Sequence, residues 1–249
     1  MTLRYEINPP KIIQKSLSQE DSLKQLDTVN LRVSEIESLC DGIHFTDSVL
    51  GIPRISPISA GKLIRKSYQD IEITVSLRVR DKNLTTLRNL MEQSVAEKIN
   101  GVLILKGDAS PTEQKDSGLI PSSTVKYFNE LGFNKKLDIF LSLPNYPNFD
   151  KIQKKIDAEP TGFITQVIHS VDEVSRIVDK LKPDGFKIIP CILLPSEKNT
   201  KSAEFLKLDW SKYKNSVEDF IKQVNQIAGD VLITSPNDFS YAKEVLAKL

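Results

Sequence analysis

One stretch of the sequence joins a strongly apolar run to charged residues. Residues 102–105 are four consecutive apolar residues, which is typical of a parallel strand covered on both faces. Lys106, Gly107 and Asp108 follow at once, before a Ser-Pro turn. Because glycine lets the backbone approach a flat ligand and a carboxylate accepts from ring N–H groups, Asp108 is a candidate binding or catalytic residue. A helix-capping aspartate is the alternative that this motif alone leaves open.

A second candidate acid lies near the start of the chain. Glu6 falls in a short predicted strand, residues 3–7, between Tyr5 and Ile7, so we expect half-apolar surroundings for its side chain. Burial raises the pKa of a carboxyl group, and a carboxyl that keeps its proton near neutrality can act as a general acid. An ion pair with a lysine or arginine of the sheet is the competing role. Two acids also suggest glycoside hydrolysis, but the chain has one tryptophan, Trp210, where sugar sites usually need aromatic platforms.

Apolar patterning predicts strands and helices in regular alternation. The predicted strands are residues 3–7, 42–46, 72–77, 101–105, 137–143, 162–168, 186–194 and 231–234. The predicted helices are residues 18–37, 58–67, 84–98, 121–131, 149–158, 171–181, 199–207, 217–227 and 238–248. Ser18, followed by Asp21, is expected to cap the first helix, and Ser170, followed by Glu173, the sixth.

About eight strand–helix units in 249 residues predict an α/β fold, a (β/α)8 TIM barrel forming a single domain over residues 1–249. A doubly wound open sheet is the alternative, which the absence of a G-x-G-x-x-G motif after the first strand weakens. In a barrel the carboxyl ends of the strands surround one mouth, where active sites lie. The polar residues expected there are Glu6, Thr46, Asp47, Arg78, Arg80, Lys106, Asp108, Gln166, Ser196 and Thr234.

Composition excludes several classes of function. The formal charge is +1, from 34 basic and 33 acidic residues, so nothing favours nucleic acid or an anionic membrane as a partner. No apolar run approaches the roughly 20 residues that span a bilayer, and the start lacks a hydrophobic signal core, so we expect a cytoplasmic protein. Cys40 and Cys191 lack metal or redox spacing. His44 and His169 are expected to be core or rim residues, and no metal site is predicted.

Four segments, in chain order, resemble the motifs of one enzyme family. Residues 5–11 (Tyr-Glu-Ile-Asn-Pro-Pro-Lys) resemble the family's first-strand signature, aromatic-Glu-aromatic-aromatic-Pro-Pro-Lys. Residues 103–108 (Leu-Ile-Leu-Lys-Gly-Asp) resemble its fourth-strand Leu-Arg-Gly-Asp. Residues 163–166 (Phe-Ile-Thr-Gln) and 188–195 (Ile-Ile-Pro-Cys-Ile-Leu-Leu-Pro) are similar to its Ile-Thr-Gln and Ile-Ile-Pro-Gly-Ile-Leu-Pro segments. Together these four segments resemble the methylenetetrahydrofolate reductases, and the resemblance covers nearly the whole chain.

The resemblance implies an oxidoreductase of folate and one-carbon metabolism, linked to methionine biosynthesis. Such enzymes are flavin-containing TIM barrels that reduce 5,10-methylenetetrahydrofolate to the 5-methyl form, commonly with NAD(P)H. By this match Glu6 is the general acid that helps open the imidazolidine ring, and Asp108 lies between flavin and folate. Gln166 would hydrogen-bond the pterin, and Phe205 would stack on the nicotinamide or the folate side chain. The flavin contacts it implies are Thr46, Lys106, Asp108 and Lys155.

The chain departs from the family on the flavin side. Lys106 replaces an arginine, Ser76 stands where a histidine is common, and residues 145–149 lack the Glu and His of the family's Tyr-Pro-Glu-x-His stretch. We expect FAD as cofactor, while FMN, a weakly bound flavin or no flavin stay open. The alternative function is a non-flavin pterin-binding subunit that works with a separate electron-transfer partner. Folate against a modified pterin, the electron donor and a homo-oligomeric state also stay open.

Overall fold

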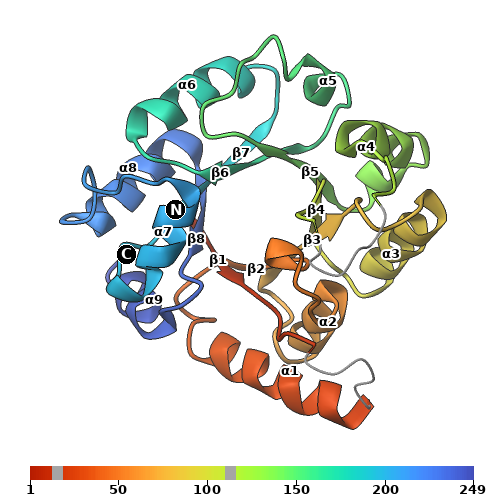
Figure 1. Ribbon diagram of the computed structural model, residues 1–249, viewed down its shortest axis with the longest axis horizontal. Coiled ribbons are helices and arrows are strands. Elements are labelled where there is room, and N and C mark those ends of the chain that lie inside the picture. The colour runs from red at the N-terminus through yellow and green to blue at the C-terminus, as the bar shows by residue number, and fades with distance from the viewer. Residues whose placement is uncertain (13–18, 110–115) are drawn as a thin grey trace.

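A computed structural model describes residues 1–12, 19–109 and 116–249, without the side chains of residues 19–23. The described strands are parallel and pair in sequence order, and β8 closes the sheet by pairing with β1 (Figure 1). The predicted TIM barrel is therefore confirmed. The strands are β1 (Thr2–Ile7), β2 (Gly42–Phe45), β3 (Glu72–Arg78), β4 (Gly101–Leu105), β5 (Asp138–Leu143), β6 (Gly162–Val167), β7 (Lys187–Leu193) and β8 (Asp230–Thr234).

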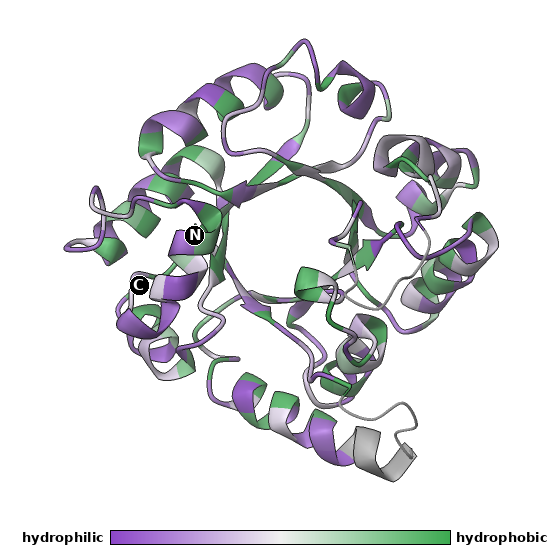
Figure 2. Ribbon diagram, in the orientation of Figure 1, coloured by the Kyte–Doolittle hydropathy of each residue, from purple (hydrophilic) through white to green (hydrophobic). Residues whose placement is uncertain are grey.

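Helices surround the barrel and turn their apolar faces toward the strands (Figures 1 and 2). They are α1 (Gln19–Ser34), α2 (Pro57–Ser67), α3 (Leu84–Ala96), α4 (Pro121–Glu130), α5 (Gln153–Ile156), α6 (Val171–Leu181), α7 (Thr200–Leu206), α8 (Val217–Ala228) and α9 (Phe239–Leu246). Short 3-10 turns are η1 (Val49–Gly51), η2 (Phe133–Lys135) and η3 (Glu197–Asn199). Within the described ranges, no helix has the length and apolar character needed to cross a bilayer.

The predicted helix over residues 149–158 is wrong at its start, because α5 begins only at Gln153. The backbone of residues 148–152 forms a turn instead, in which Asn148 O accepts from Lys151 N and Ile152 N. The Phe149 ring lies against Arg176 of α6. This tertiary contact outweighs the local preference for helix, which is a weak determinant over so few residues.

Two helix caps follow from local side-chain chemistry. Ser170 Oγ accepts from Glu173 N at 3.4 Å, and Glu173 Oε2 accepts from His169 N at 2.7 Å, so the expected cap at Ser170 is confirmed. Asn83 caps α3 in the same way by accepting from Thr86 N. The expected cap at Ser18, and the Ser-Pro turn at residues 110–111, lie outside the described residues.

The barrel interior has a polar half and an apolar half. Alternate residues of a strand point inward, and on β4 to β8 these form an apolar cluster: Leu103, Phe140, Ile164, Ile189, Cys191 and Leu232. On β1 to β3 the buried polar residues include Arg4, His44, Thr74, Ser76 and Arg78. A ligand entering from the mouth therefore meets a hydrogen-bonding wall on β1 to β3 and a largely apolar wall on the other side, where Ser142 and Thr165 are polar exceptions.

Gly162, the first residue of β6, marks a close approach of two strands. A methyl group built on it would overlap the carbonyl of Lys187, whose carbonyl carbon would lie 2.8 Å away. Because backbone cannot yield as a side chain can, we expect Gly162→Ala to lower the free energy of unfolding by about 3 kcal/mol. Urea unfolding measures this loss.

Gly185→Ala is the matched control. Gly185 has φ +88° and nothing within 4 Å of the added methyl, so only left-handed backbone strain of roughly 1 kcal/mol is expected. Equal losses for the two variants would show that the β6–β7 contact is not tight.

Candidate active-site cavity

A cavity of about 180 Å³ lies within the barrel and brings the two predicted acids together. Glu6 of β1 and Asp108, three residues beyond β4, both line it, as does Thr46 after β2. The full lining is Glu6, His44, Thr46, Asp47, Val49, Ser76, Leu103, Leu105, Gly107, Asp108, Ser142, Ile164, Thr165, Cys191 and Leu232. Strand ends far apart in the sequence thus line one shared cavity, which is open toward the mouth of the barrel.

Glu6 is held at the polar side of this cavity. Thr234, the last residue of β8, donates its hydroxyl to Glu6 Oε1 at 2.7 Å. Burial raises the pKa of Glu6 above its usual value, and the hydrogen bond from Thr234 offsets only part of that rise. No ion pair with a lysine or arginine is seen for Glu6 within the described residues, so the side chain is suited to keep a proton.

Asp108 lies at the rim, where it holds a loop. Its Oδ2 accepts from the backbone N–H of Leu50 in η1 at 2.9 Å. Ser48 and Leu50 have φ values of 46° and 58°, and Gly51 has 68°. Left-handed backbone is unfavourable for serine and leucine, so the contact with Asp108 helps retain a strained loop whose Val49 lines the cavity.

His44 is a cavity residue that the sequence assigned to the core or rim. It is almost fully buried, with Nδ1 2.8 Å from Thr74 Oγ1 and Nε2 2.9 Å from Ser76 Oγ. Burial and, to a smaller extent, the charge of Arg4 together lower the pKa of the ring to about 3. The imidazole is therefore neutral, with one nitrogen donating and the other accepting.

The lowered pKa of the His44 ring should make the free energy of unfolding depend on pH. In the unfolded chain the ring takes up a proton near its ordinary pKa of 6.5, whereas in the folded protein it stays neutral down to about pH 3. The folded state binds fewer protons in this window, so the contribution of His44 is present above pH 6.5 and is lost as the pH falls toward 3. Within this window the free energy of unfolding changes by up to about 1.4 kcal/mol per pH unit.

Urea unfolding between pH 4 and pH 7 measures this slope. We expect His44→Gln to reduce the slope by the amount that corresponds to nearly one bound proton, whatever its effect on overall stability. His169→Gln should leave the slope unchanged. An unchanged slope in His44→Gln would show that the buried ring takes up a proton in the folded state.

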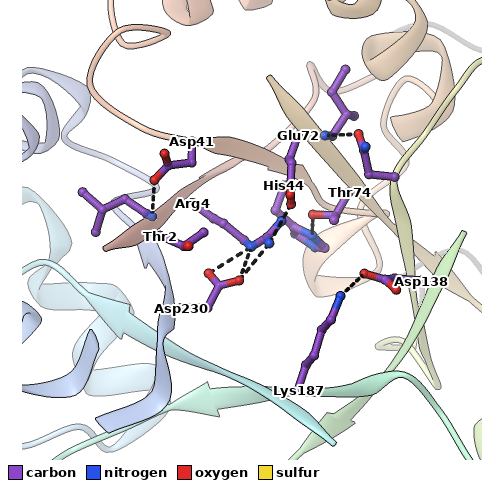
Figure 3. A network of polar contacts seen from close by, with 12 residues as sticks. Thr2, Arg4, Asp41, His44, Glu72, Thr74, Asp138, Lys187 and Asp230 are labelled. Atoms are coloured by element: carbon purple, nitrogen blue, oxygen red, sulfur yellow. Dashed lines mark hydrogen bonds and ion pairs between the residues drawn. The ribbon is translucent and has the colours of Figure 1, made fainter. Parts of the chain in front are cut away.

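Charged side chains close the amino-terminal end of the barrel below the cavity (Figure 3). Arg4 Nε donates to both Asp230 oxygens, at 3.0 and 2.8 Å, and Arg4 Nη2 lies 2.7 Å from Glu72 Oε2. Lys187 pairs with Asp138 at 2.8 Å between the starts of β7 and β5. The Arg4 contacts, with the His44 hydrogen bonds above them, fix the polar side of the barrel, whereas the exposed Lys187–Asp138 pair belongs to the other half.

The two lysines predicted as flavin contacts are occupied elsewhere. Lys106 Nζ pairs with Asp116 Oδ1 at 2.6 Å and donates to Leu119 O at 3.3 Å. Lys155 Nζ donates to the carbonyl of Ser142 at 2.5 Å, and burial lowers its pKa. Neither lysine lines the cavity, although the Lys155 contact lies directly behind the cavity residue Ser142.

The two predicted substrate contacts also lie outside the cavity. Gln166 is exposed, because the pairing of β6 with β7 shifts register between Ile164 and Val167. The shift brings Thr165 to the cavity, where its hydroxyl accepts from Cys191 N at 3.0 Å. Phe205 on α7 is 70% exposed.

These side chains do not fit a flavin enclosed in the cavity. Among the described residues the lining includes no phenylalanine, tyrosine or tryptophan and no lysine or arginine, and 180 Å³ is below the roughly 300–1,000 Å³ of ligand pockets. The cavity can hold one reacting ring edge, with a proton donor on one wall and aliphatic side chains on the other. The same residues include no cluster of three or more metal-binding side chains.

This chain resembles known proteins in its architecture. No protein-family model and no curated protein sequence matches it. A solved structure of 7,8-dihydropteroate synthase from Vibrio fischeri ES114 superposes with a TM-score of 0.54 at 10% identity, covering 99% of this chain and 91% of that one. The likeness is one of fold.

Two other solved structures support the same conclusion. The GH18 chitinase ChiB of Flavobacterium johnsoniae gives a TM-score of 0.58 at 12% identity, over 99% of this chain and 93% of that one. A 2,3-dimethylmalate lyase of the PEP mutase/isocitrate lyase superfamily gives 0.55 at 9% identity, over 99% and 78%. Barrels with different chemistry match equally well, so function must be argued from the cavity.

Proposed function

We propose that this protein is an enzyme that acts on a reduced pterin, with Glu6 as the proton donor. The supporting observation is the shared cavity, in which Glu6 keeps a raised pKa beside the neutral His44 and opposite an aliphatic wall. A pterin ring has one edge rich in N–H and C=O groups and two flat faces, which match a polar and an apolar wall. The resemblance to methylenetetrahydrofolate reductases names the same acid.

The reaction we assign is the reduction of a 5,10-methylene-tetrahydropterin to its 5-methyl form. The bond from the methylene carbon to N10 breaks, its electron pair stays on N10, and Glu6 supplies the proton that N10 takes up. The carbon, now part of an iminium at N5, accepts a hydride from a reductant. Glu6 is suited to this because a carboxyl with a raised pKa holds a proton near neutral pH and can transfer it directly to N10.

A second candidate is a pterin-binding subunit without a flavin of its own, served by a separate electron-carrying protein. The contacts of Lys106 with Asp116 and of Lys155 with Ser142 favour it, since both cations expected on the flavin are engaged. In this version Glu6 and the cavity keep their roles, and only the source of the hydride changes.

The absorption spectrum of freshly purified protein separates the two. Yellow protein that is bleached by dithionite and reoxidised by methylenetetrahydrofolate supports a reductase with its own flavin. Colourless protein that binds tetrahydrofolate in a calorimeter supports the subunit. Colourless protein that binds no reduced folate contradicts both.

A further inference from the structure

A second pocket, open to solvent at the surface, lies apart from the first, between the segment that follows β5 and helix α6. Its volume is about 690 Å³, which is within the range of pockets that hold small molecules. It shares no residue with the cavity of Glu6, and nothing in the proposed reaction uses it. Its lining is Tyr146, Pro147, Asn148, Phe149, Asp150, Arg176 and Lys180.

Arg176 is fixed in this pocket by contacts on its faces and at one edge. Its Cζ lies 4.1 Å from the ring centroid of Tyr146 and 4.7 Å from that of Phe149. Its Nη2 donates to the carbonyl of Pro147 at 3.0 Å. Stacking on aromatic rings and a directed hydrogen bond hold a planar guanidinium in one orientation, which prepares it to bind a ligand.

One nitrogen of this guanidinium has no acceptor. Arg176 Nη1 is shielded from solvent and finds no hydrogen-bond partner among the described residues. A charged donor buried without an acceptor is costly, and such a group marks a place where an ion, a water or a ligand completes the structure. The pocket also contains the cation of Lys180, one helical turn along α6, against the single carboxylate of Asp150.

We propose that this pocket binds the phosphate or carboxylate group of a small anionic ligand. Arg176 would hold the anion through the N–H groups of Nη1, and Lys180 would supply the second positive charge; guanidinium donors match the oxygens of both anions. Because Nη1 has no contact with solvent, side chains of the pocket must shift when the anion binds; Tyr146 is 66% exposed and so has room to move. The site is formed by α6 and the segment after β5 alone, so it stands whether or not the first cavity binds a pterin.

Calorimetric titration of the full-length protein tests this site, with inorganic phosphate in one series and glutarate in another, both at constant ionic strength. We expect saturable binding of at least one of them, and a preference between them identifies the ligand group as phosphate or carboxylate. Arg176→Gln should weaken that binding at least tenfold. Arg32→Gln is the control, because Arg32 also lies over an aromatic ring, that of Phe239 at 5.7 Å, and should bind as the wild type does.

Two results would overturn the site: no saturable binding of either anion to the wild type, or equal binding by Arg176→Gln. If Arg176→Gln fails to fold by circular dichroism, Lys180→Gln replaces it. Lys180 is exposed on the helix surface, so this variant should fold and bind the anion about threefold more weakly. Unchanged binding by Lys180→Gln would then count against the proposal.

Discussion

Glu6→Gln should lower the turnover of methylenetetrahydrofolate by about 10²- to 10⁴-fold, the usual contribution of a general acid. Glutamine has nearly the same shape and can still accept from Thr234, whose hydroxyl lies 2.7 Å from Glu6 Oε1, so the cavity should keep its form. What the variant lacks is the proton that the departing N10 must receive. Chromatographic measurement of the 5-methyl product, with an excess of reductant, gives the rate.

Asp138→Asn is a matched control for Glu6→Gln. Asp138 is also an acid at the end of a barrel strand, but it pairs with Lys187 at the amino-terminal end, away from the cavity. We expect its turnover to stay within about twofold of the wild type. A Glu6→Gln variant with normal turnover would remove Glu6 from the mechanism, whatever the control shows.

Asp230→Ala should produce the largest loss of stability among the single changes considered, about 3–5 kcal/mol. It would leave the guanidinium of Arg4, which is 8% exposed, inside the barrel without the carboxylate that accepts from its Nε. A buried charge that loses its partner is much more costly than the pair itself, because desolvation is no longer compensated. Urea unfolding at neutral pH measures the difference.

Glu72→Ala removes the other carboxylate that contacts Arg4 and serves as the control. The Glu72 side chain is 48% exposed, so its ion pair is weakened by solvent, and a loss below about 1 kcal/mol is expected. The double variant Arg4→Met, Asp230→Leu should recover most of the stability lost in Asp230→Ala, because it removes both buried charges together. Equal losses for Asp230→Ala and Glu72→Ala would show that Arg4 is solvated in the folded protein.

The architecture could be predicted because its main signal is local. The unbroken apolar run of β4, and similar runs in β7, are what strands covered by helices require, and the alternation with helices leaves few topologies. Glu6 and Asp108 could be predicted as neighbours for the same reason, since both lie toward the carboxyl ends of strands that surround one mouth.

Positions that depend on pairing between segments could not be predicted from the sequence. Counting alternate residues along β6 points Gln166 inward, but the register shift beside β7 exchanges it for Thr165. Lys106 has its partner, Asp116, ten residues later in the sequence. No local sequence pattern predicts the register shift or the Lys106–Asp116 pair.

The sequence predicted His44 as a core or rim residue, and the structure shows a buried ring that also lines the cavity. His44 pairs in register with Glu6 on one side and with Thr74 on the other, so an inward Glu6 implies an inward His44. Ser76, at a position where the sequence resemblance led us to look for a histidine, lies 2.9 Å from the His44 ring. An imidazole is thus supplied to that part of the cavity by the neighbouring strand.

The most direct test of the account is an NMR titration of protein labelled with ¹³C at the glutamate side-chain carboxyl. We expect one glutamate resonance to titrate above pH 4.5, the ordinary pKa of the group, because burial raises the pKa of Glu6. That resonance should be missing from Glu6→Gln, and it should move when tetrahydrofolate is added to the wild type. If every glutamate titrates near its ordinary pKa, or if tetrahydrofolate leaves the Glu6 resonance unchanged, the cavity is not a proton-donating pterin site.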